Sequence, residues 1–201
     1  MSVLLLVAYI IHQFEEHWID LLGEQYAFYT DVNALILSVL GAQGTEAMPL
    51  TPEAIFFINT ALVWLVGAIA IWRSPEHLFP ALAMASITLV NGVSHIILGV
   101  VQQAYNPGLL TAIILFLPLA IAFYYYILNT NSAVKAQIIV SIIWSVLAHV
   151  LMVAGLLAAN WFNLIPESSY FIALIVWSII PAFLFNAPQT VVQPEQLEVS
   201  G

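Results

Sequence analysis

The stretch SVLLLVAYIIHQFEEHWIDLL, residues 2–22, begins as an apolar run and carries histidines and glutamates in its second half. Its length matches the roughly 20 residues that a helix needs to cross the hydrocarbon core of a bilayer. We therefore expect a membrane-spanning helix over Ser2–Leu22 that holds polar side chains at membrane depth.

The composition of the whole chain extends this pattern. Of its 201 residues, 63% are hydrophobic, and only 2 are basic against 11 acidic. A soluble domain is roughly 45–50% apolar, so the composition excludes a soluble globular protein. At about 20 residues per span, it predicts an all-α fold, a polytopic membrane helix bundle of about six transmembrane helices.

Five further spans are predicted as apolar runs bounded by polar or turn-forming residues. They cover Thr51–Trp72, Phe79–Gln102, Leu109–Leu128 with a kink at Pro118, Ala136–Ala159 and Tyr170–Phe185. A shorter apolar stretch, Ala34–Leu40, is too brief to cross and should lie at the interface or re-enter. Residues 1–187 then form a single transmembrane domain, and residues 188–201 a disordered tail.

The few cations predict an orientation. Arg73 and Lys135 fall in loops on the same side of a six-span arrangement, and positive loops stay cytoplasmic. Both termini are then cytoplasmic, in a plasma or inner membrane, with membrane lipids as neighbours. The net charge of −9 and the lack of a basic cluster exclude nucleic acid as a partner.

Glu15 and Glu16 are the anomaly, because the other acids lie in loops, at span ends or in the tail. An ionised residue at the centre of a span costs about 2.5–3.5 kcal/mol, and each Leu, Ile, Val or Phe returns only about 0.3–0.6 kcal/mol. We therefore expect both carboxylates to face protein, water or a cation and not lipid.

The spacing of the polar residues predicts a single site. His12, Glu15 and Glu16 are spaced i, i+3 and i+4, which places them on one helix face, whereas His17 points elsewhere and should be interfacial. Other spans carry polar groups at a similar depth in the bilayer. These are Asn59, Asn91, His95 and His149. Residues at equal depth on packed helices can converge on one cavity.

Three motifs resemble a known family. His12-Gln13-Phe14-Glu15-Glu16, the histidine in Asn91-Gly92-Val93-Ser94-His95, and Tyr105-Asn106-Pro107-Gly108 look like the HXXEE-domain family of small membrane proteins, over about Leu4 to Tyr126. That family has no established activity, so the resemblance supports the choice of residues and implies no reaction.

The leading hypothesis is a membrane metalloenzyme. His12, Glu16 and His95 would bind one divalent metal with His149 as a fourth ligand, Zn being favoured and Fe or Mn suited to the same donors. Glu15 would act as general base on a metal-bound water. Hydrolysis of a lipid-like or small apolar substrate is the favoured reaction, and oxidation is the alternative.

Two other functions use the same residues. A carboxyl group kept protonated by burial could drive a metal-free isomerase or cyclase acting on a sterol or terpenoid. A proton or divalent-cation pathway would also need intramembrane acids and histidines. In the enzymatic models, Asn59, Asn91 and Tyr105 are expected to contact substrate or to support the ligands.

Overall fold

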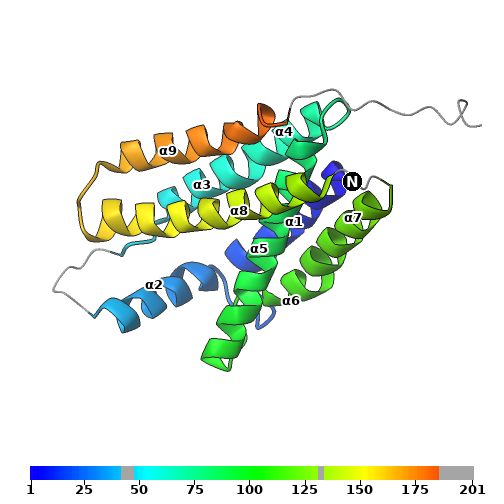
Figure 1. Ribbon diagram of the computed structural model, residues 1–201. Helices are drawn as coiled ribbons and strands as arrows, with labels where there is room; N and C mark the ends of the chain where they lie inside the picture. The colour runs from blue at the N-terminus through cyan, green and yellow to red at the C-terminus, as the bar shows by residue number, and fades with distance from the viewer. Residues whose placement is uncertain (42–47, 131–133, 186–201) are drawn as a thin grey trace, which may run out of the picture.

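The computed structural model describes residues 1–41, 48–130 and 134–185, and these residues form helices joined by turns (Figure 1). No β-strand occurs in these ranges, where Ile19 and Gln25 form an isolated bridge. The predicted all-α fold is therefore confirmed. The predicted disordered tail, residues 188–201, lies outside the described residues.

Four continuous helices are long and apolar enough to cross a membrane. The first runs over Pro52–Arg73, as α3 (Pro52–Asn59), a π-helical turn (Thr60–Leu65) and α4 (Val66–Arg73). The second is α5 (Leu78–Gln102). The third covers Leu109–Thr130, as α6 (Leu109–Thr111), a π-helical turn (Ala112–Phe116) and α7 (Leu117–Thr130). The fourth, Lys135–Trp161, comprises α8 (Lys135–Leu156) and a π-helical turn (Leu157–Trp161).

Local sequence explains how these helices begin and where they are irregular. The Thr51 hydroxyl accepts a hydrogen bond from the Ala54 N–H at 3.1 Å, and Pro52 occupies the first turn, where it removes no helical hydrogen bond. The π-helical turn Ala112–Phe116 lies just before Pro118, the residue where the sequence predicts a kink. Proline has no N–H to donate to the helix, so irregular hydrogen bonding is expected there.

Three helices are shorter, namely α1 (Ser2–His17), α2 (Ala27–Leu40) and α9 (Glu167–Ile179), which a 3-10 turn extends to Ala182. The sequence prediction that the first span reaches Leu22 was wrong, because the helix ends at His17. Beyond it, a carboxylate oxygen of Asp20 accepts the N–H groups of Leu22 and Glu24, and Gly23 has φ +85°. This local turn replaces helical hydrogen bonding.

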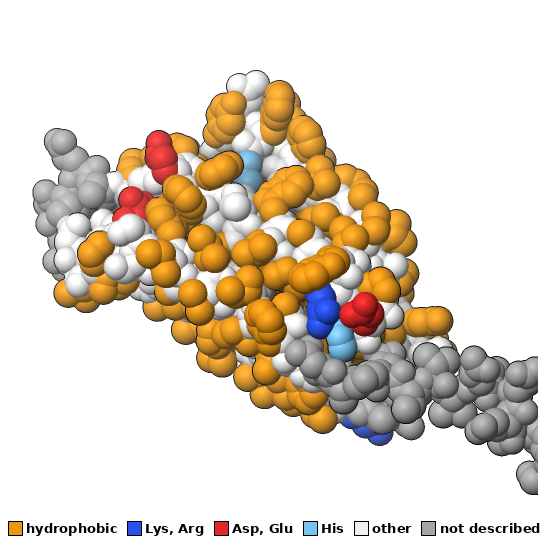
Figure 2. Space-filling view, turned by 90° about the horizontal axis from the view of Figure 1, so that it is seen from above, with side chains coloured by type: hydrophobic (Ala, Val, Ile, Leu, Met, Phe, Trp, Pro, Cys, Tyr) orange, Lys and Arg blue, Asp and Glu red, His pale blue; other side chains and the backbone are white. Residues whose placement is uncertain are grey.

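Helix α5 is the central element, and α1, α4, α7 and α8 pack around it (Figure 1). Its first half is buried on every side, from Phe79 to Thr88. Small side chains such as Ala81, Ala83 and Ala85 let the neighbouring helices approach closely. The outer surface is largely hydrophobic, as Figure 2 shows for one face. An apolar surface of this extent suits a lipid environment.

The N-terminus and both basic residues lie at one end of the bundle. The Ser2 hydroxyl is hydrogen-bonded to that of Ser74, next to Arg73, at 3.4 Å. Helix α8 begins with Lys135 near the same end (Figure 1). The polar residues of α1 lie toward its other end, next to α6 and α2.

Candidate metal centre

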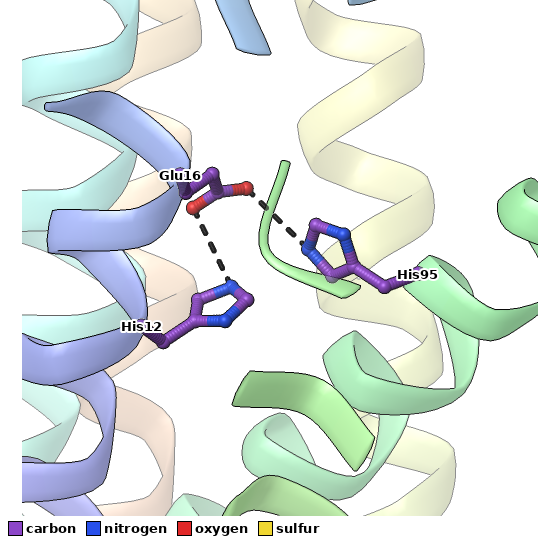
Figure 3. A group of neighbouring side chains, drawn as sticks. All are labelled: His12, Glu16 and His95. Atoms are coloured by element: carbon purple, nitrogen blue, oxygen red, sulfur yellow. Dashed lines mark ion pairs between the residues drawn. The ribbon is translucent and has the colours of Figure 1, made fainter. Parts of the chain in front are cut away.

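Three buried side chains converge between α1 and α5. His12 and Glu16 come from α1 and His95 from α5, with exposed fractions of 0%, 7% and 5%. One ligand atom from each lies within 4.8 Å of the others. Figure 3 shows the Glu16 carboxylate between the two imidazoles, 3.6 Å from His12 Nε2 and 3.5 Å from His95 Nε2. These separations exceed those of ordinary hydrogen bonds.

Asn106 fixes the orientation and the tautomer of His95. The Asn106 amide nitrogen donates to the backbone carbonyl of His95 at 3.0 Å, so its side-chain oxygen faces His95 Nδ1, 2.8 Å away. An amide oxygen can only accept, hence Nδ1 carries the hydrogen. His95 Nε2 therefore presents a lone pair toward Glu16.

Thr111 fixes the orientation and the tautomer of His12 in the same way. Its hydroxyl lies 2.7 Å from His12 Nδ1 and donates to a carboxylate oxygen of Glu15 at 2.5 Å. Because the hydroxyl hydrogen goes to Glu15, His12 Nδ1 is the donor to Thr111 and Nε2 holds the lone pair. His12 Nε2 is buried and has no hydrogen-bond partner among the described residues.

Glu15 faces α6, away from the group formed by His12, Glu16 and His95. Its carboxylate accepts four hydrogen bonds, from the backbone N–H groups of Leu110 and Thr111 and from the hydroxyls of Tyr105 and Thr111. The backbone donors belong to the first turn of the helix Leu109–Thr130, a position that favours an anion. Both oxygens are therefore committed, which differs from the general-base role that the sequence predicts.

Tyr105 closes the Glu15 site from the outside. Its hydroxyl donates to Glu15 at 2.8 Å and accepts the Leu21 N–H at 3.0 Å. Partial burial, together with the nearby Glu15 carboxylate, raises the pKa of the Tyr105 hydroxyl above its usual range, so it remains a donor. Tyr105 thus ties the turn before α6 to the chain that follows α1.

Gly108 lies against both imidazoles. Its φ of +91° favours glycine, and a Cβ added there would lie 2.6 Å from His12 Cε1 and 2.7 Å from His95 Cε1. The turn Tyr105–Gly108 therefore supplies a donor to Glu15, an acceptor to His95 and a close backbone contact. Sequence reasoning singled out only Tyr105 here. For Asn106 and Gly108, the available signal in the sequence was that they belong to the same short motif as Tyr105, Tyr105-Asn106-Pro107-Gly108.

His17 also reaches Glu16, although the sequence predicts that it points elsewhere. Its Nε2 lies 3.1 Å from a Glu16 oxygen and 3.0 Å from the Asn59 amide nitrogen. Neighbouring residues of a helix point in different directions, but the flexible Glu16 side chain extends toward the imidazole. The helical spacing that places His12 with Glu16 could not reveal this contact.

A cavity of about 370 Å³ adjoins the group on the side away from α6. Its polar lining includes the residues that the sequence places at one depth, Glu16, Asn59, Asn91, His95 and His149. The structure does not bring His149 into the three-ligand group: its Nδ1 donates to the Ser145 carbonyl at 2.8 Å and its ring lies on the cavity wall. Asn91 donates to the Tyr9 hydroxyl at 3.1 Å.

Comparison with known proteins gives a family and no activity. No curated protein and no solved structure matches this chain significantly. Residues 3–123, more than half of the chain, match the family model described as a protein of unknown function with HXXEE motif. The matched region contains His12, Glu15, Glu16, His95 and the turn at Gly108, and the chain belongs to this HXXEE family.

Proposed function

We propose that this protein is a membrane metalloenzyme whose single divalent cation is bound by His12, Glu16 and His95. One observation carries the proposal: both imidazoles commit Nδ1–H to fixed acceptors and direct a lone pair at one carboxylate. Metal-binding histidines characteristically donate their other ring nitrogen in this way.

The separations also suit a metal. Tetrahedral ligands at about 2.1 Å from Zn²⁺ are about 3.4 Å apart, and the histidine nitrogens lie 3.5 and 3.6 Å from Glu16 oxygens. Three acceptors that face one another repel unless a cation lies between them. Two nitrogens and an oxygen favour Zn, and Fe or Mn accepts the same donors.

The bound metal would supply Lewis-acid chemistry on the cavity side of the group. The residues around the metal would position its ligands. Glu15, through Thr111, would orient His12, and we assign it this positioning role instead of the general-base role. His17, whose Nε2 lies 3.1 Å from a Glu16 oxygen, would help to position that carboxylate. Hydrolysis of a lipid-like or small apolar substrate remains the favoured reaction, with oxidation as the alternative.

The membrane arrangement that accompanies this function has six spans, in which α1 and α9 join the four long helices. Arg73, Lys135 and both termini would face the cytoplasm of a plasma or inner membrane. Helix α2 would lie at the outer interface, above the cavity. In this arrangement an apolar substrate would reach the site from the lipid.

Elemental analysis of the purified protein tests the metal centre. We expect about one metal ion per chain, and its loss in His12→Gln and in His95→Gln. His77→Gln, in the turn before α5, is the matched control and should retain the metal. His149→Gln tests the fourth ligand, and should also retain it if the three-residue group is complete. Wild-type protein without metal, or metal content unchanged in both ligand variants, would refute the proposal.

A metal-free acid–base enzyme is the second candidate. The contact that favours it is the one between a Glu16 oxygen and His17 Nε2, which lie 3.1 Å apart, within hydrogen-bonding distance. An isomerase or cyclase would then use this pair on a sterol or terpenoid. Its activity would survive exhaustive chelation, whereas that of the metalloenzyme would not.

A further inference from the structure

We propose that the cavity beside the His12–Glu16–His95 group binds a neutral, apolar alcohol of about a dozen non-hydrogen atoms, with its hydroxyl between His149 and the metal centre. This inference rests on the proposed function, since Glu16 and His95 line the same cavity. It adds the size, the charge and the hydrogen-bonding character of the bound molecule. An alcohol has no bond to hydrolyse, so under the favoured reaction it would be the product released from an ester.

The volume sets the size. The cavity measures about 370 Å³, and a water-sized group occupies about 30 Å³. It therefore accommodates on the order of a dozen non-hydrogen atoms, near the lower end of the range for small-molecule sites. A phospholipid with two long chains is much larger than this space.

The lining sets the charge. Most of the wall is apolar, with Phe28 and Val32 from α2, Ile55 from α3 and Leu156 from α8. No lysine or arginine is among the described residues that line it, and the acid present is Glu16. Apart from the proposed metal, an anionic head group such as a phosphate would find no cation among these described residues. A neutral ligand avoids that cost.

The polar groups of the cavity determine whether the ligand must donate or accept a hydrogen bond. Because His149 Nδ1 donates to the Ser145 carbonyl, its Nε2 is an acceptor, and it has no hydrogen-bond partner among the described residues. The Asn91 amide nitrogen is used by Tyr9, which leaves the amide oxygen available as an acceptor. A ligand that carries a donor satisfies these groups. On an uncharged, apolar molecule that donor is a hydroxyl.

Saturation binding of radiolabelled dodecanol to the protein in nanodiscs, corrected with empty nanodiscs of the same lipid, tests the proposal. We expect saturable binding of one molecule per chain. Dodecyl methyl ether, which lacks the donor, should compete about tenfold more weakly. In protein from which the metal has been removed by a chelator, dodecanoate should compete no better than the ether. Non-saturable uptake, or equal competition by alcohol and ether, would overturn the proposal.

Two variants locate the binding site. His149→Phe keeps a ring but removes the acceptor, so dodecanol should bind about tenfold more weakly while the ether is unaffected. Leu156→Phe fills the apolar wall and should weaken both ligands. Val150→Phe, on the exposed face of α8 next to His149, is the matched control and should bind as wild type. Wild-type binding in both cavity variants would overturn the assignment.

Metal content measured on the same samples separates this inference from the proposed function. Stoichiometric metal without saturable dodecanol binding contradicts the alcohol as ligand of the cavity and leaves the metal centre in place. Dodecanol binding that depends on His149 in protein without metal contradicts the metalloenzyme and supports the alcohol as ligand of the cavity.

Discussion

The two sides of α1 use adjacent glutamates in opposite ways. On the α6 side, Glu15 is surrounded by four hydrogen-bond donors, and both of its oxygens are committed. On the cavity side, Glu16 faces the lone pairs of His12 and His95 at distances too long for hydrogen bonds, and its close contact is with His17 Nε2 at 3.1 Å. Of two adjacent glutamates, the half-buried one can therefore secure the fold while the buried one remains available to a ligand.

Gly108, which touches the imidazoles from the α6 side, should give the largest effect. Gly108→Ala combines strain at φ +91° with a Cβ that would overlap both rings. We expect a loss of about 2–4 kcal/mol in the free energy of unfolding and loss of the metal, measured by thermal unfolding and elemental analysis. Gly23→Ala has a similar φ of +85° and open space around its Cβ, so it should retain the metal. Equal effects of the two changes would contradict the steric argument.

The two glutamates should separate stability from binding. Glu15→Gln places an amide NH₂ group among hydrogen-bond donors, so we expect a loss of about 2 kcal/mol in the free energy of unfolding. Glu16→Gln removes a buried charge and, compared with wild type in metal-free buffer, should change this free energy by no more than about 1 kcal/mol, yet abolish metal binding. Chemical unfolding in detergent and metal titration measure the two quantities. The reverse pattern would exchange the roles assigned to these residues.

Thr111 connects the two sides. Thr111→Val removes the hydroxyl between His12 and Glu15 at nearly constant volume, and we expect metal affinity to fall about 10–100-fold. Thr111→Ser keeps the hydroxyl and is the matched control, with affinity close to wild type. Competition with a chelator of known affinity measures the change. If valine and serine gave the same affinity, Thr111 would have no part in orienting His12.

Tyr105 should give the smallest effect. Tyr105→Phe removes one of the four donors to Glu15 and leaves the other three, so we expect a loss of about 1 kcal/mol in the free energy of unfolding. Metal content should not change, because Tyr105 does not contact His12, Glu16 or His95. Tyr125→Phe, on the exposed surface of α7, is the matched control and should be neutral. Loss of metal in Tyr105→Phe would place the tyrosine in the metal centre.

The sequence predicted a good part of this molecule. Apolar runs located the four long helices, because the length and hydropathy of a span are local properties. The i, i+4 spacing placed His12 with Glu16, and matching depth associated them with His95. The end of α1 was missed, since an Asp20 turn and Gly23 overrode the continued apolar pattern at Leu21 and Leu22.

The supporting residues were harder to predict. Asn106 contacts His95, which lies 11 residues earlier, and Thr111 contacts His12 on another helix. Asparagine and threonine are ordinary residues in a turn and at the start of a helix, so neither was noticeable in the sequence. His17 was assigned to the interface because its direction along α1 differs from that of Glu16. The structure places the His17 ring next to Asn59 of the facing helix, whose amide nitrogen lies 3.0 Å from His17 Nε2.

By itself, the sequence determined that this chain is a helical bundle with helices long and apolar enough to cross a membrane, and that a histidine and two glutamates share one helix. Those conclusions follow from hydropathy and from helical periodicity, which are set by neighbours in the chain. Only the tertiary structure decided that Glu15 accepts hydrogen bonds from the N–H groups at the start of the helix Leu109–Thr130, whereas Glu16 lies with His12 and His95. The choice depends on which donors and acceptors the packed helices bring to each carboxylate, and no local pattern contains that information.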